Sequence, residues 1–493
     1  MEQTHSEAVA LDERDYSRKW LVLSAVAMGI FLATIDGSIV NVALPTLTNA
    51  LNATFATVQW VVLAYLLTIT TLLAIVGRLA DMYGRKRLYN SGFVVFTIGS
   101  LLCGLSPTVG WLIGFRVLQG VGAALILALG MALVTDAFPP EERGRALGIT
   151  GSIVSIGIVT GPTLGGIIIE NLSWHWIFFV NVPIGILGTW LVWRNIPTTQ
   201  PPGGQRFDFG GAAALCLGLL GILLGLTTGQ EEGFTSPTAL GLFAFGIFFL
   251  LALLFIQRRH PQPIIDPVLF RNRLFTINLF TGLMVFIGLG SGVLIPFYLE
   301  TVLGYGVQQV GFLLAVVPIA LGIVSPISGA LSDRMGSRLI SSLGLAVTLI
   351  GYLTLSTLST ETTAVGFMLR YVLIGIGVAL FQSPNNSALM GTAPRERLGV
   401  ASGLLAMTRN LGQTVGIAAL GALWAARVFA AAGGPVSGGA TTAPIEAQAA
   451  GLSDVSLVVA GLVGVGLLVS LWAWWGERHS RDESRESNVR PTS

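Results

Sequence analysis

Residues 77–87 read GRLADMYGRKR, and residues 329–339 read GALSDRMGSRL, which repeats the same pattern. Gly77, Asp81 and Gly84 of the first stretch align with a glycine, an aspartate and a glycine 252 residues later. Two further pairs of stretches match at an offset of 254, namely FRVLQGVGAAL at 115–125 with LRYVLIGIGVAL at 369–380, and PPEERGRA at 139–146 with APRERLGV at 393–400. Three matches at nearly one spacing indicate an internal duplication.

The duplicated unit is apolar enough to be a bundle of membrane helices. Of the 493 residues, 53% are apolar and 11% are charged, whereas soluble domains are about 25% charged. Backbone groups in hydrocarbon must be satisfied within the segment, so each apolar run of about 20 residues is expected to be a helix. The run that begins at Trp20 is too long for a signal-peptide core and contains an acid, which predicts a retained span. Windows of about 19 residues predict fourteen helices, near 20–43, 57–76, 88–107, 111–134, 146–168, 174–193, 210–228, 239–257, 274–297, 310–330, 339–358, 363–384, 398–424 and 455–475.

The basic residues predict the topology. If all fourteen helices cross the membrane, 23 of the 27 Lys and Arg residues lie in segments that share one face. The positive-inside rule assigns that face, and with it both termini, to the cytoplasm. We therefore expect a multi-pass protein of the cell inner (plasma) membrane.

Duplication and topology together predict the fold class: an all-α integral membrane protein with two pseudo-symmetric six-helix bundles and two inserted helices. Paired repeats that enclose a site near the membrane midplane are the architecture of secondary transporters. The expected parts are a cytoplasmic N-terminal tail (1–19), an N-terminal bundle (20–194), a linker with two extra helices (195–257), a cytoplasmic loop (258–273), a C-terminal bundle (274–476) and a cytoplasmic tail (477–493).

Several functional classes are excluded by composition and motifs. A net charge of +2 gives no field that would attract nucleic acid. Cys103 and Cys216 lie in apolar runs, which predicts neither a disulfide framework nor a metal site. A phosphate-binding loop needs Gly-Lys, but Lys19 and Lys86 both follow arginine. We expect no cofactor and no enzymatic activity, because the sequence contains no HExxH or GxSxG motif.

Four motifs carry a family resemblance over nearly the whole chain: LATIDGSIVNVALP at 32–45, the loop at 77–87, the helix at 115–125 and GIVTGPTLGG at 157–166. With them the sequence resembles the major facilitator superfamily, and specifically its fourteen-helix drug:proton antiporters. The resemblance implies proton-coupled multidrug efflux and antibiotic resistance. It also implies that the acid of the first helix takes part in coupling.

Asp36 lies near the middle of the first predicted helix, where an ionised carboxylate costs about 2.5–3.5 kcal/mol. Because burial favours the neutral form, Asp36 is predicted to carry one proton per transport cycle. Arg116 keeps its charge and is predicted to tune that exchange by approaching and withdrawing. Asn41 and Gln119 are assigned to the same proton and substrate pathway. The alternatives are a structural ion pair and hydrogen bonds between helices.

Gly157, Gly161 and Gly165 recur every four residues and place three bare backbones on one helix face, where another helix can pack closely. Pro162 adds a kink. In the resembled family this helix is the antiporter motif. Glycine packing without any bearing on the direction of transport is the alternative.

The loop at 77–87 is predicted to form a cytoplasmic latch of Gly77, Asp81, Gly84 and Arg85, in which the acid complements a helix dipole of the other half. Adding 254 to Glu170 gives a position close to Arg427, so these two residues are predicted to form an outer gate. Two solvated surface charges, worth about 0–1 kcal/mol, are the alternative.

These expectations converge on an exporter of amphipathic, cationic or neutral organic compounds that works by alternating access. Its partners are the substrate, protons and membrane lipids, and a monomer is the expected unit. One alternative keeps the fold but exports a lipid, siderophore or metabolite. A remote alternative is a non-transporting membrane sensor or a channel, neither of which accounts for a midplane acid within paired repeats.

Overall fold

A computed structural model describes residues 18–139, 142–197, 208–259, 268–392, 394 and 398–489. Within these ranges the regular structure is helical and contains no strand. Thirteen helical segments of the described chain are long and apolar enough to cross a membrane. The fourteenth predicted helix is also present, but it begins with three bases, Arg85, Lys86 and Arg87, which lower its mean hydropathy. The predicted count of fourteen is therefore confirmed for the described residues.

The N-terminal helices are α2 (Lys19–Ala50), α3 (Phe55–Val58), α4 (Trp60–Tyr83), α5 (Arg85–Gly104), α6 (Val109–Ala137), α7 (Arg143–Asn171), α8 (Trp176–Phe179) and α9 (Asn181–Asn195). Two long helices follow, α10 (Phe209–Glu232) and α11 (Pro237–Arg259). The C-terminal elements are η1 (Leu269–Arg271), α12 (Arg273–Gly290), η2 (Ser291–Leu294), α13 (Ile295–Phe297), η3 (Tyr298–Val302), α14 (Val307–Leu314), α15 (Val316–Met335), α16 (Ser337–Leu355), α17 (Ala364–Thr392), α18 (Leu398–Ala431), η5 (Ala440–Thr442) and α19 (Ile445–Val489).

The helix contacts repeat between the two halves of the chain. In the N-terminal half α2 packs along α7, α4 and α5 pack along α6, and α5 packs along α9. In the C-terminal half α12 packs along α18, α15 and α16 pack along α17, and α16 packs along α19. Each contact of one half has a counterpart in the other, so the pseudo-symmetric arrangement predicted from the repeats is present in the packing.

The repeated loop has the same backbone in both halves. Gly84 joins α4 to α5 with φ of 90°, and Gly336 joins α15 to α16 with φ of 91°. Residues with a Cβ rarely adopt this conformation. The glycine that aligns in the two sequence motifs is therefore required by the sharp turn between consecutive helices.

The helices α10 and α11 pair with each other, and α10 also contacts α4 and α18. Asp208 caps α10, because its Oδ1 accepts a hydrogen bond from Gly211 N at 2.8 Å. Gln257 of α11 donates to Oδ2 of the same carboxylate at 3.0 Å, which ties the two helices together at this end. The pair thus touches helices of both halves.

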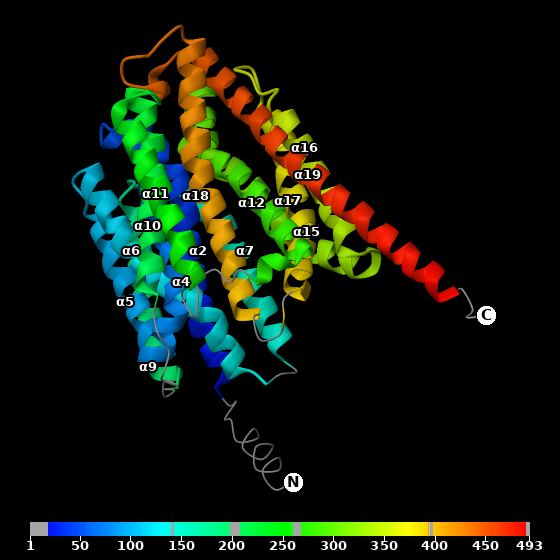
Figure 1. The fold of residues 1–493 in the computed structure, drawn as a ribbon. Helices are drawn as coiled ribbons and strands as arrows, with labels where there is room; N and C mark the ends of the chain where they lie inside the picture. Colours follow the sequence, from blue (N-terminus) through cyan, green and yellow to red (C-terminus); the bar gives the residue numbers. More distant parts are fainter. Residues whose placement is uncertain are drawn as a thin grey trace.

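Aromatic rings join the halves where α2 leads into α3. The ring of Phe55 lies 5.1 Å from that of Phe297 and 5.0 Å from that of Trp424, centre to centre. The C-terminal part of α7 also packs against α14 at this end, where a Cβ on Gly166 would lie 2.7 Å from Val307 O. Figure 1 shows α19 running obliquely away from the N-terminal helices, from this end toward the C-terminus.

Candidate functional site

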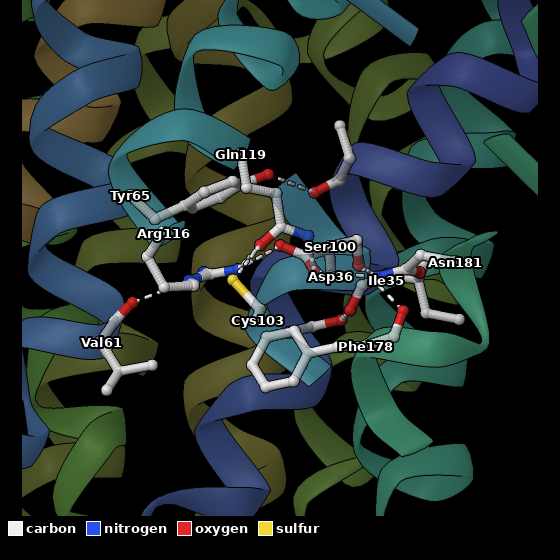
Figure 2. Close-up of polar contacts among 12 residues, drawn as sticks. Ile35, Asp36, Val61, Tyr65, Ser100, Cys103, Arg116, Gln119, Phe178 and Asn181 are labelled. Atoms are coloured by element: carbon white, nitrogen blue, oxygen red, sulfur yellow. Dashed lines mark hydrogen bonds and ion pairs between the residues drawn. The ribbon is translucent and has the colours of Figure 1, made fainter. Parts of the chain in front are cut away.

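Asp36 lies in the middle of α2, and its side chain is 0% exposed. Helices α4, α6 and α9 surround it, and each of the last two supplies donors to its carboxylate. Arg116 Nη1 donates to Asp36 Oδ2 at 2.6 Å. Gln119 Nε2 and Asn181 Nδ2 donate to Oδ1 at 2.7 Å and 2.9 Å. Figure 2 shows the carboxylate between these three side chains.

Arg116 is fixed by more than its ion pair. Its Nε donates to Val61 O at 2.8 Å, and its Nη1 also donates to Gln119 Oε1 at 2.8 Å. The guanidinium lies 4.0 Å from the centre of the Tyr65 ring, so a cation–π contact covers one of its faces. Val61 and Tyr65 are four residues apart and therefore share one face of α4. Helix α4 thus holds the guanidinium against α2.

The spacing of Arg116 and Gln119 explains why both reach Asp36. Residues three apart on a helix lie on the same face, so α6 presents its base and its amide to α2 together. Arg116 Nη2 is buried and makes no hydrogen bond within the described part of the chain. The two N–H groups of Nη2 are therefore left over after Asp36, Gln119 and Val61 are satisfied.

The pair is electrostatically balanced while Asp36 is ionised. Removing one member of a buried ion pair commonly costs about 3–5 kcal/mol, because the other charge is left without compensation. Protonation of Asp36 has the same consequence for Arg116 without any change of sequence. The arrangement can therefore convert binding of one proton into a change in the force between α2 and α6.

Three neighbours of this site were not predicted from the sequence: Tyr65, Asn181 and Ser100. Asn181 Nδ2 also contacts Ser100 Oγ at 3.1 Å, and Ser100 Oγ donates to Phe178 O at 2.9 Å. Asn181 is a polar residue inside an apolar run, directly before Val-Pro. This position could have marked it as a candidate for the polar site. Tyr65 carries no such signal, because an aromatic residue in a membrane helix is ordinary.

Asn41 is not part of this network. Its Oδ1 is buried and has no hydrogen-bond partner among the residues that the structure describes. Gln119, by contrast, is central to the site, and it also accepts a weak hydrogen bond from Cys103 Sγ at 3.6 Å. Of the four residues predicted for the pathway, the structure therefore brings together Asp36, Arg116 and Gln119.

The glycine-rich face of α7 packs directly on α2, the helix that carries Asp36. A Cβ on Gly161 would lie 2.9 Å from Ile39 N, and one on Gly165 would lie 2.7 Å from Ile39 Cγ1. Ser38 Oγ lies 3.3 Å from Gly157 O and donates to it. Pro162 lies in the same helix, and its carbonyl oxygen faces Gly311 of α14. The motif thus contacts α2 on one side and the C-terminal half on the other.

The predicted latch is resolved only in part. Gly77 and Asp81 belong to α4, but the surroundings of their side chains lie outside what the structure describes. Gly84 is the turn residue between α4 and α5. Arg85 forms an ion pair with Asp136 at the end of α6, a helix of its own half.

The predicted outer gate between Glu170 and Arg427 is not formed. Arg427 Nε instead lies 3.7 Å from Asp454 Oδ2, on the neighbouring α19 of the same half. Glu170 interacts electrostatically with Glu300 of the π-helical turn η3, which is another acid. The offset of the repeat placed Glu170 and Arg427 at related positions, but Asp454 offers Arg427 a partner that is closer.

No group of three His, Cys, Asp or Glu side chains among the described residues is placed to hold a metal ion. The site consists of a carboxylate, a guanidinium and two amides, which can bind a proton and exchange hydrogen bonds.

Comparison with known proteins identifies the family. The sequence profile of the Major Facilitator Superfamily matches residues 26–417. The chain is 36% identical to the riboflavin transporter RibZ of Clostridioides difficile over 403 residues, which cover 81% of this chain and 87% of that protein. It is 34% identical to the multidrug resistance protein Stp of Mycobacterium tuberculosis over 408 residues, covering 82% and 76%. It is 31% identical to the multidrug transporter MdtP of Bacillus subtilis over 417 residues, covering 84% and 77%.

The fold has a counterpart among solved structures. A bacterial homologue of the human lysosomal transporter Spinster, in an inward-facing and unoccupied conformation, superposes with a TM-score of 0.65. The alignment covers 93% of this chain and 98% of that one, at 17% identity, so it establishes the fold. The chain therefore belongs to the major facilitator superfamily, and it is a multi-pass membrane transporter and not an enzyme.

Proposed function

We propose that this transporter exports amphipathic organic compounds in exchange for protons, with Asp36 as the proton carrier and Arg116 as the residue that tunes it. The observation that carries the proposal is the ion pair of 2.6 Å between two side chains that are each 0% exposed. Ionisable residues within membrane helices are costly and typically belong to ion pathways or proton relays. The relatives named as multidrug transporters favour drug-like cargo, with antibiotic resistance as its consequence.

The coupling step follows from the balance of charge. An ionised Asp36 holds α2 to Arg116 on α6, whereas a protonated Asp36 leaves the guanidinium with no compensating charge. The two protonation states therefore favour different relative positions of α2 and α6, which shifts the equilibrium between transporter conformations. Binding of substrate then favours the state in which Asp36 has released its proton.

Alternating access requires the two bundles, 20–194 and 274–476, to rock against each other about a substrate site at their interface. With both termini in the cytoplasm of a plasma-membrane protein, the contact between α7 and α14 would close the external side. The Gly77–Arg85 turn would then act as the latch of the opposite side. The membrane potential contributes about 2.3 kcal/mol per 100 mV for each charge moved.

The test is a transport assay in proteoliposomes with an imposed pH step, run on the full-length protein and on Asp36→Asn. We expect the wild type to accumulate a fluorescent drug against its gradient. We expect Asp36→Asn to lose coupled accumulation by about 100-fold, because the amide cannot exchange a proton. The matched control is Asp454→Asn, which removes an exposed acid from an ion pair at the surface and should retain coupling.

Equal coupled transport by the wild type and Asp36→Asn would contradict the assignment of the proton site. Accumulation that survives collapse of the pH gradient by a protonophore would contradict proton coupling itself.

The second candidate keeps the fold and changes the cargo to a metabolite. It is favoured by the relative named as a riboflavin transporter, which shares 36% identity. Binding of flavins and of cationic dyes to the purified protein separates the two candidates. Tight binding of a flavin without binding of dyes would support metabolite transport.

A further inference from the structure

A second guanidinium lies inside the membrane helices without the partners that Arg116 has. Arg409 belongs to α18, and its side chain is half-buried. It makes no hydrogen bond or ion pair with any other residue that the structure describes. Arg370, the sequence counterpart of Arg116, is instead satisfied by Thr357 Oγ1 at 3.0 Å and Gly366 O at 2.8 Å. An uncompensated base at this depth costs about 2.5–3.5 kcal/mol, and such residues mark substrate pathways.

The packing of α18 shows which way Arg409 faces. Gly412 and Gly416 pack against α12, where a Cβ on Gly412 would lie 2.7 Å from Phe286 Cβ. Farther along α18, Gly421 and Trp424 contact Phe55 of the N-terminal half. By helical periodicity Arg409 projects between these two directions. It therefore points toward the boundary between α12 and the N-terminal half, on the part of α18 that leads away from the aromatic contacts at Phe55.

Two amide side chains lie near Arg409 along α18. Asn410 and Gln413 are half-buried, and their side chains make no hydrogen bond within the described chain. Each amide offers N–H donors and a carbonyl acceptor. A polar group held by Arg409 can therefore gain a second hydrogen bond from the same helix.

The acids Asp36 and Glu300 of the membrane helices are not paired with Arg409. Asp36 receives three hydrogen bonds and is neutralised by Arg116. Glu300 interacts with Glu170, and its buried Oε1 has no hydrogen-bond partner among the described residues. Within the described part of the chain, Arg409 therefore has no acid that compensates its charge. A substrate that supplies a negative charge there recovers the cost of burying the guanidinium.

We propose that Arg409 anchors an acidic oxygen group of the substrate, a carboxylate or an enolate, with Gln413 one turn away as a second contact. A guanidinium can hold such a group through two parallel hydrogen bonds. The inference rests on the proposed function and narrows it to amphipathic weak acids, in place of the cationic or neutral compounds that the sequence favoured. Because Arg409 compensates the charge of the bound acid locally, coupling to Asp36 passes through the conformational change.

The experiment uses two dyes that share a xanthene core and differ in charge, anionic fluorescein and cationic rhodamine 123. Their binding to the full-length protein in nanodiscs is measured by fluorescence anisotropy, with protein-free nanodiscs subtracted. We expect the wild type to bind fluorescein more tightly than rhodamine 123. Arg409→Gln should lower the affinity for fluorescein at least tenfold and change the affinity for rhodamine 123 less than twofold. Arg409→Lys should lower the affinity for fluorescein by a smaller factor. Lysine keeps the positive charge but cannot form the two parallel hydrogen bonds of a guanidinium.

Two further variants keep the test decisive if Arg409→Gln folds poorly. Gln413→Glu places an acid one helical turn from Arg409, where it can compensate the guanidinium. We expect it to weaken fluorescein and to strengthen rhodamine 123 binding. Arg427→Gln removes a base that is exposed and paired with Asp454, and it should change neither dye.

A wild type that prefers rhodamine 123, or an Arg409→Gln protein that binds fluorescein unchanged, would overturn the proposal. An equal loss of both dyes would also overturn it, because it would indicate a structural role for Arg409. Proton coupling is scored separately with rhodamine 123 in proteoliposomes. Loss of coupling in Asp36→Asn with retention in Arg409→Gln supports the proposed function whatever the outcome for fluorescein.

Discussion

At the scale of single residues, the ion pair between Asp36 and Arg116 makes a prediction about stability. Arg116→Gln leaves a buried carboxylate without its base, and Asp36→Asn leaves a buried guanidinium without its acid. Each single variant should lower the free energy of unfolding by about 3–5 kcal/mol, and the double variant by less than the sum. Thermal unfolding of the purified proteins in one detergent measures this cycle. Strict additivity would mean that the two charges do not stabilise each other.

The aromatic face over Arg116 makes a smaller prediction. Tyr65→Leu removes the ring that lies 4.0 Å from the guanidinium, which should cost about 0.5–2 kcal/mol. Tyr65→Phe keeps the ring and loses only the hydrogen bond from the hydroxyl to Ala33 O, which is 3.2 Å long. We expect transport to fall in the leucine variant and to be largely retained in the phenylalanine variant. The reverse order would assign the role of Tyr65 to its hydroxyl.

The sequence predicted part of this site, and the reason lies in what each residue signals. Asp36 and Arg116 stand out because charges are rare in apolar runs. Gln119 could be added because it follows Arg116 by one helical turn. Val61 O and Tyr65 could not be found, because a backbone carbonyl has no sequence signature and a tyrosine is ordinary in a membrane helix. Their role depends on how α4 packs, which periodicity does not determine.

At the scale of elements, the contact between α7 and α2 is set by glycines. Gly161→Ala would place a Cβ 2.9 Å from the backbone nitrogen of Ile39, which cannot rotate away as a side chain can. We expect overpacking to cost about 1–3 kcal/mol and to slow transport. Gly151→Ala is the matched control in the same helix, because a Cβ there would have no atom within 4 Å. It should be neutral or slightly stabilising through helix propensity.

The same comparison separates packing from mechanism. Transport rate and thermal stability are measured for Gly161→Ala, Gly151→Ala and the wild type. If Gly161→Ala matched the control in both measurements, the close approach of α7 to α2 would have no bearing on stability or on transport.

The internal repeat predicted one feature of the elements correctly and another wrongly. It located the glycines at the two α4–α5 and α15–α16 turns, since both turns need a positive φ. It failed for Glu170 and Arg427, because a repeat relates positions and not partners. Asp454 lies in the last helix, close to Arg427, and this contact depends on how α18 and α19 pack.

At the scale of the whole molecule, the two halves share their packing but not their charges. The N-terminal half holds a compensated pair at Asp36 and Arg116, whereas the C-terminal half holds Arg409 without a described partner. Duplication fixed the helix arrangement, which is why hydropathy and repeats predicted the fold. The halves differ in individual charged side chains, and the partners of these side chains are known only from the contacts in the structure.

The contact between α7 and α14 gives a prediction about motion of the whole molecule. These helices belong to different halves, and Glu170 Oε2 would lie 3.7 Å from a Cβ on Gly306, just before α14. If transport requires the halves to separate here, joining Glu170→Cys and Gly306→Cys with a short bis-methanethiosulfonate cross-linker should stop it, and reduction should restore it. The half-buried Cys216 is replaced by Ser in this background, while the buried Cys103 is kept.

The matched control is a cross-link that joins two helices of one half. Arg427→Cys and Asp454→Cys lie on α18 and α19, whose side chains already meet at 3.7 Å. The same cross-linker there spans no boundary between the halves, so transport should continue at the rate of the reduced protein. The initial rate of dye export from proteoliposomes, before and after cross-linking, measures both pairs. Full activity of the cross-linked Glu170–Gly306 pair would mean that the halves do not part at α7 and α14, and alternating access would then have to open elsewhere.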